Sequence, residues 1–169
     1  MTLSMYQASA PVFIKMLGNL KGILQKAEAH AQAKKIDESA FLGARLFPDM
    51  LAFTSQVHVA TDFARGTCAR LSGAEPPSIE SNEKSFAELI SRIDRSVEYV
   101  KSLKPAQIDG SEGREIVRQV RGKDHKFTGQ NYLLQYALPN FYFHTTMAYA
   151  LLREGGVEIG KQDFIGSLD

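Results

Sequence analysis

The sequence predicts an all-α fold, a four-helix bundle with a short β-hairpin between the third and fourth helices. Apolar residues recur every three or four positions along four long segments, which is the period of a helix that buries one face. One segment instead combines β-branched residues with a glycine-containing turn, which is typical of a hairpin. At 169 residues with 44% hydrophobic residues, the chain is expected to fold as one domain over residues 1–169.

The first helix is expected over residues 4–34. Ser4 and Gln7 form a capping-box pattern, in which each side chain accepts a hydrogen bond from the other's backbone amide. A continuous apolar stripe follows. Pro11 lies inside this segment and is expected to kink the first turns, unless the helix begins nearer Ala10.

The second helix is expected to begin at Pro48 and Asp49, because proline suits a first turn and an acid there complements the helix dipole. Residues 36–47 before it read as a connection with room for a short turn of helix. The third helix is expected at residues 85–103, after a Gly- and Pro-containing loop at 72–81. This loop has moderate length, which favours antiparallel second and third helices.

The hairpin is expected within residues 115–128, with its turn at 121–124. The fourth helix is expected over residues 130–153, with a kink at Pro139 and glycines after its end. The remaining tail, residues 155–169, is too short for another domain, and its apolar side chains predict that it docks on the bundle.

Composition and charge exclude several classes of protein. The net charge is +1, so no broad basic face for nucleic acid is expected. The lone cysteine, Cys68, cannot form an intrachain disulfide, which fits a reducing, cytoplasmic location, and it reads as an inert core residue. No run approaches the roughly 18 apolar residues that a membrane span needs, and no glycine-rich phosphate loop or nucleophile elbow is present. The first residues are not expected to act as a signal peptide.

Three polar residues on apolar helices are the candidate site. Asn140 and His144 lie four positions apart, so they share one side of the fourth helix, and His58 lies in the second helix. If these helices are neighbours, the three converge in the interior. They would then hold a divalent metal, with Asp62 as an alternative third ligand. Alternatively they form a metal-free pocket or network, bonded to one another and to backbone carbonyls.

Aromatic side chains surround His144 and are expected to form core or a dimer interface, because they dominate buried area. A tyrosine hydroxyl among them is also available to hydrogen-bond a bound ligand. Asp62, Tyr136 and Tyr149 are therefore the candidate ligand-pocket residues beside the histidines.

The pattern of His58 and Asp62, a hairpin and then NFYFHTTMAYALLR resembles the DinB/YfiT-like superfamily. The segments SMYQASAPVFIKMLGNL, FPDMLAFTSQVHVATDFA and LPNFYFHTTMAYALLREGGVEIGKQDF resemble a bacterial branch of it, known only as a domain of unknown function. The resemblance covers nearly the whole chain.

This resemblance implies an up-down-down-up helical bundle, commonly a homodimer. It also implies a divalent metal, often nickel or zinc, held by three histidines, with some members acting on low-molecular-weight thiols. His58 and His144 match two of these ligands, whereas Asn140 stands where the first ligand of the final helix is expected. Three functions stay open: a metal-dependent transferase or hydrolase, a metal-free small-molecule-binding protein, and a structural dimer.

Overall fold

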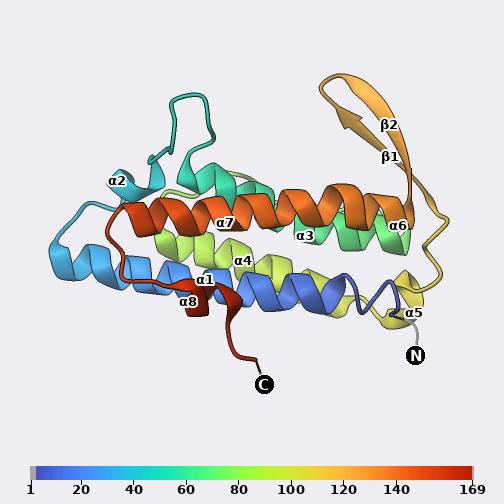
Figure 1. The fold of residues 1–169 in the computed structure, drawn as a ribbon, viewed down its shortest axis with the longest axis horizontal. Helices are drawn as coiled ribbons and strands as arrows, with labels where there is room; N and C mark the ends of the chain where they lie inside the picture. Colours follow the sequence, from blue (N-terminus) through green and yellow to red (C-terminus); the bar gives the residue numbers. More distant parts are fainter. Residues whose placement is uncertain (1–2, 169) are drawn as a thin grey trace.

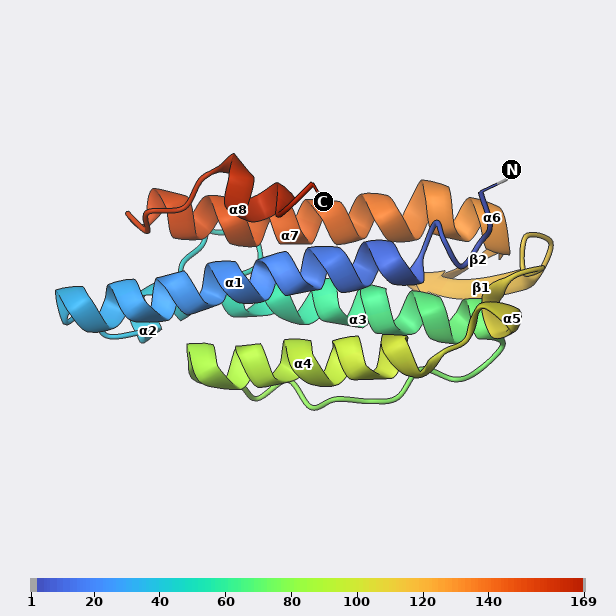
Figure 2. The ribbon, with the colours of Figure 1, turned by 90° about the horizontal axis from the view of Figure 1, so that it is seen from below.

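The computed structural model describes residues 3–168 and is mostly helical, with one two-stranded antiparallel sheet (Figure 1). Four long helices run along the same axis: α1 (Ala10–Lys34), α3 (Phe53–Ser72), α4 (Phe86–Ser102) and α7 (Leu138–Glu154) (Figures 1 and 2). Their apolar faces bury one continuous core. The helical fold with its hairpin is thus confirmed.

Short elements add to the four predicted helices. They are α2 (Ser39–Leu42), α5 (Pro105–Ile108), β1 (Glu115–Val120), β2 (Lys123–Thr128), α6 (Gly129–Asn131), the π-helical η1 (Tyr132–Ala137) and α8 (Lys161–Ile165). The helix α2 is the short turn expected in the first connection.

The helices α3 and α4 are parallel. Arg92 of α4 donates to Thr61 of α3 over 2.8 Å, and Arg65 of α3 donates to Ser96 of α4 over 3.3 Å. Residue numbers therefore rise together along both helices. The antiparallel arrangement favoured by the loop length is wrong, because residues 73–85 run back along the helices before α4 begins (Figure 2).

The helices α3 and α7 are antiparallel. Gln56 near the start of α3 contacts His144 of α7 over 2.7 Å, and the Phe63 and Tyr136 rings lie 5.7 Å apart further along. As the number on α3 rises, the number of its partner falls. The helices α3 and α7, which correspond to the predicted second and fourth helices, are thus antiparallel neighbours.

The first helix begins at Ala10, the alternative start that Pro11 indicated, rather than at Ser4. Ser4 and Gln7 make the reciprocal capping contacts, at 3.1 and 3.2 Å. They nevertheless close only a turn, and α1 begins at Ala10 with Pro11 in its first turn. The local pattern was present without the helix that normally follows it, because proline is better placed at a helix start than inside it.

The start of α3 at Pro48–Asp49 is also wrong. Residues around it form an exposed turn, in which the Met50 amide donates to the Phe47 carbonyl over 2.9 Å. The helix begins at Phe53 instead. Proline and an acid are compatible with a first turn, but they are equally common in turns outside helices.

The irregularity predicted in the last helix lies just before Pro139. Residues of η1 form π-type bonds, and α7 begins at Leu138 with Pro139 in its first turn. Because proline has no amide hydrogen, the regular bond to the carbonyl four residues earlier is missing there. The hairpin turn is Arg121–Gly122, both with positive φ, which matches the twist of the two strands.

The tail docks on α1, as expected. Asn19 donates to the Phe164 carbonyl over 3.0 Å, Lys26 pairs with Asp163 over 2.6 Å, and the Phe164 ring contacts Tyr149. No helix within residues 3–168 has the length and apolarity to cross a membrane.

Candidate functional site

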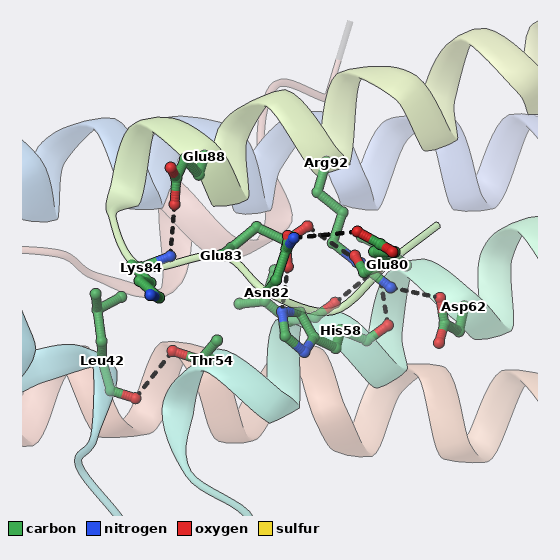
Figure 3. Close-up of polar contacts among 12 residues, drawn as sticks. Leu42, Thr54, His58, Asp62, Glu80, Asn82, Glu83, Lys84, Glu88 and Arg92 are labelled. Carbon is green, nitrogen blue, oxygen red and sulfur yellow. Dashed lines mark hydrogen bonds and ion pairs between the residues drawn. The ribbon is translucent and has the colours of Figure 1, made fainter. Parts of the chain in front are cut away.

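His58 points from α3 toward the loop of residues 73–85 (Figure 3). Its Nε2 lies 2.8 Å from Oε2 of Glu83, and the two side chains are 13% and 3% exposed. Neither atom has a hydrogen-bond partner among the described residues, so the 2.8 Å contact is a close polar approach without hydrogen-bond alignment. Burial, followed by the charge of Arg92, lowers the pKa of His58. The ring is therefore neutral near pH 7, and its Nε2 faces the carboxylate of Glu83.

Arg92 is the centre of this network and is fully buried. Its guanidinium donates to the Thr61 hydroxyl at 2.8 Å, to the Glu80 carbonyl at 2.8 Å, to Glu83 at 3.1 Å and to Asp62 at 2.8 Å (Figure 3). Burial raises the pKa of Glu83, but a backbone hydrogen bond and the Arg92 charge outweigh it, so this pKa lies below its usual value. Arg92 and Glu83 thus form a buried, paired set of charges.

A second buried arginine, Arg65, reinforces the same region. It donates to the Pro77 carbonyl at 2.8 Å, to Ser96 at 3.3 Å and to Asp62 at 2.7 Å. Arg65 and Arg92 therefore share the half-exposed carboxylate of Asp62, and each binds one loop carbonyl. Together they hold residues 73–85 against α3 and α4.

On the other side of α3, His144 and Asn140 each have their own partner. His144 Nδ1 lies 2.7 Å from Gln56 Oε1, its ring stacks on Phe63 at 6.3 Å, and burial lowers its pKa. Asn140 donates to the Tyr136 carbonyl, one helical turn earlier, over 2.7 Å. The shared face of residues 140 and 144 does not give them shared contacts.

His58, Asn140 and His144 thus make three separate contacts, to Glu83, Tyr136 and Gln56. The Asn140 contact uses the Nδ2 donor rather than the Oδ1 that would bind a metal, and the His144 contact uses Nδ1 rather than Nε2. No group of three or more His, Cys, Asp or Glu residues able to hold a metal lies within residues 3–168. Each of the three residues thus has a polar contact of its own without a metal.

Sequence reasoning missed the partners that organise this region. Arg92 falls at apolar spacing between Leu89 and Ile93, and such a charge in an apolar stripe signals a buried ion pair. Glu83, in the loop before α4, carried no comparable signal. Cys68 is buried as expected, and burial raises its pKa to about 12, which suppresses the reactive thiolate.

A cleft of about 420 Å³ lies beside α3, between that helix, the loop, β1 and η1. Its lining is Val59, Asp62, Phe63, Arg65, Gly66, Arg70, Pro76, Pro77, Ser78, Arg118 and Tyr132. Of the predicted pocket residues, Asp62 lines it, and Tyr136 lies one layer behind, packed on Phe63 at 5.7 Å. Tyr149 lies elsewhere, against Phe164 of α8.

Comparison with known proteins gives a family but no activity. A family model described as "Domain of unknown function (DUF1993)" matches residues 5–165. No curated protein matches the chain. The chain is similar to the crystal structure of a DinB family member protein from Shewanella denitrificans, with 37% identity over 96% of this chain and 92% of that chain, and a TM-score of 0.90.

Proposed function

This chain belongs to the DUF1993 family of domains of unknown function and to the DinB family. We propose that it binds a small molecule without a resident metal ion. The cleft beside α3 is the observation that carries the proposal. Its volume of about 420 Å³ lies in the range of small-molecule sites, roughly 300–1,000 Å³.

The walls of the cleft combine apolar surface with a few polar groups, as small-molecule sites do. Phe63 and Tyr132 supply aromatic surface, and Pro76 and Pro77 close one side. The loop that carries these prolines is held in place by buried Arg65, which donates to the Pro77 carbonyl. The site is therefore preorganised, which lowers the entropic cost of binding.

A blocking variant tests the proposal. Ser78 is exposed in the loop and lines the cleft, so Ser78→Trp should fill it without disturbing the core. Ser81→Trp is the matched control, because Ser81 is exposed in the same loop but outside the lining. Thermal-shift screening of a metabolite library should give ligands that stabilise the wild type and Ser81→Trp but not Ser78→Trp. Ligands that stabilise all three proteins equally would contradict the cleft as the site.

The metal hypothesis stays a prediction with a separate test. His58, Asn140 and His144 would hold a nickel or zinc ion, which would supply an activated water or thiolate to a transferase or hydrolase. Protein purified without a histidine tag is expected to contain no stoichiometric metal by elemental analysis. A stoichiometric metal that disappears in His58→Ala and in His144→Ala would instead favour the metal-dependent enzyme.

The homodimer also stays a prediction, and α7 supports it. Phe143 is 53% exposed and the adjacent Tyr142 is 38% exposed on this helix. Neighbouring exposed apolar side chains are typical of a protein–protein contact surface. Sedimentation analysis is expected to give a dimer that Phe143→Lys weakens, whereas Ser91→Lys on the exposed side of α4 leaves it unchanged. A monomer for the wild-type protein would reject the dimer.

A further inference from the structure

We propose that the ligand of the cleft is a small organic anion, whose carboxylate or phosphate group is bound by Arg70, Arg118 and the Tyr132 hydroxyl. This inference rests on the proposed function, since it names the chemical class that the cleft takes. The three residues come from α3, β1 and η1, so they meet only in the folded chain.

The balance of charge in the cleft is positive. Arg70 and Arg118 both line it, and neither forms an ion pair within residues 3–168. The one carboxylate in the lining, Asp62, is already engaged by Arg65 and Arg92 at 2.7 and 2.8 Å. The two remaining guanidinium groups are thus left without a counter-charge.

Two hydrogen-bond donors in the cleft, Arg118 Nε and the Tyr132 hydroxyl, also lack an acceptor among the described residues. The Nε of Arg118 is buried and has no partner among the described residues, which is rare because an unpaired buried donor is costly. Tyr132 is only 1% exposed, and its oxygen accepts from Arg70 at 3.3 Å. Within the described chain its own proton has no acceptor. An oxyanion would accept from all three groups.

Gly66 makes room for one of these donors. A Cβ at this position would lie 2.6 Å from the Arg70 Nη1, so the guanidinium folds back along α3 over the glycine. Glycine inside a helix costs stability. The glycine at position 66 has a physical reason if Arg70 needs this space to bind a ligand.

The apolar part of the lining selects the body of the ligand. Phe63, Pro76 and Pro77 offer a surface for a ring or short hydrocarbon chain beside the charged groups. Carboxylates and phosphates share the oxyanion that guanidinium groups recognise. Benzoate and phenyl phosphate are suitable probes for the two head groups, and benzamide is the neutral analogue of benzoate.

Calorimetric titration of the full chain with benzoate, phenyl phosphate, benzamide and inorganic phosphate tests the inference. At least one of the two aromatic anions is expected to bind about tenfold or more tightly than benzamide. Arg70→Gln and Arg118→Gln should each weaken the binding of that anion by about tenfold or more. Lys123→Gln removes a positive charge elsewhere on the hairpin and should leave the binding unchanged. Thermal unfolding of each ligand-free variant checks the fold, and Arg118→Lys should retain part of the affinity.

The outcomes separate the inference from the proposed function. One result would overturn the anion inference but leave the cleft as a binding site. In it, benzamide binds as tightly as both anions, its binding is unchanged in the two arginine variants, and its binding is lost in Ser78→Trp. Inorganic phosphate that binds as well as phenyl phosphate would refute the apolar part of the inference. Failure of every probe to bind at millimolar concentration would overturn the inference, while library ligands blocked by Ser78→Trp would still sustain the proposed function.

Discussion

The two sides of α3 are held by different chemistry. On the α4 side, buried Arg92 and Arg65 meet Glu83, Asp62 and loop carbonyls in one charged network. On the α7 side, aromatic rings pack around His144, which contacts Gln56. The charged side depends on every partner being present, because buried charges are stable only when paired. The aromatic side depends mainly on packing.

Chain topology explains this difference. Parallel neighbours need a connection that returns along their length, and residues 73–85 make that return (Figure 2). Such a loop carries backbone carbonyls that must find donors once it lies against the helices. Arg65 and Arg92 supply them at Pro77 and Glu80. The antiparallel contact of α3 and α7 has no such loop to hold.

Replacement of Arg92 should have the largest effect. Arg92→Met removes the buried cation that pairs with Glu83 and frees the Glu80 carbonyl, so the free energy of unfolding should fall by about 3–5 kcal/mol. Urea unfolding measures this change. Arg95→Met is the control, because Arg95 is 53% exposed and lies 3.6 Å from Glu83, where an ion pair contributes about 0–1 kcal/mol. Equal losses for the two variants would contradict a special role for the buried charge.

A change to Glu83 should have the next largest effect. Glu83→Gln keeps the shape of the side chain and a polar atom near His58 but removes the charge that Arg92 faces. The loss in unfolding free energy should be about 1.5–3 kcal/mol, the range for hydrogen bonds to charged groups. Glu80→Gln is the control, because Arg92 binds the backbone of Glu80 rather than its exposed side chain. A silent Glu83→Gln would mean that the network is not electrostatically coupled.

Helical periodicity predicted the long helices because it reflects burial of one face, and the stripe through Leu89 and Ile93 lies in the core as expected. Helix starts were predicted poorly. The capping contacts of Ser4 and Gln7 form with or without a helix behind them, and proline at 48 suits a turn as well as a helix. Local signals cannot choose between such outcomes, since tertiary packing decides.

The site was harder to predict than the fold. Residue spacing placed His58 and His144 on two long helices, which the structure shows to be neighbours, but it did not predict the partner of either ring. The partner of His58, Glu83, lies in the 73–85 loop, whose direction loop length alone does not determine. The lining of the cleft combines Arg118 of the hairpin with Arg70 of α3. The sequence pattern of one segment cannot predict that residues of two segments line the same cleft.

On the aromatic side, the polar pair should contribute less. His144→Phe leaves the buried Gln56 oxygen without its partner and should cost about 1 kcal/mol in unfolding free energy. The double variant with Gln56→Met should cost less than the sum of the two single changes, because the two residues interact directly. Urea unfolding of all four proteins gives the coupling. Strict additivity would show that the 2.7 Å contact contributes nothing to stability.

The pH dependence should be the smallest effect, because both rings stay partly accessible to water. Burial lowers the pKa of His58 and of His144 below the ordinary 6.5, so the unfolded chain binds protons more readily than the folded one. Stability should therefore fall as pH drops below about 6.5, whereas the lowered pKa of Glu83 acts only at more acidic pH. Urea midpoints at about pH 7.5 and about pH 5.5 measure it. The double variant His58→Gln with His144→Gln should reduce the difference between the two urea midpoints, whereas His125→Gln, at an exposed histidine, should not. An unchanged difference in the double variant would assign the acid sensitivity to other groups.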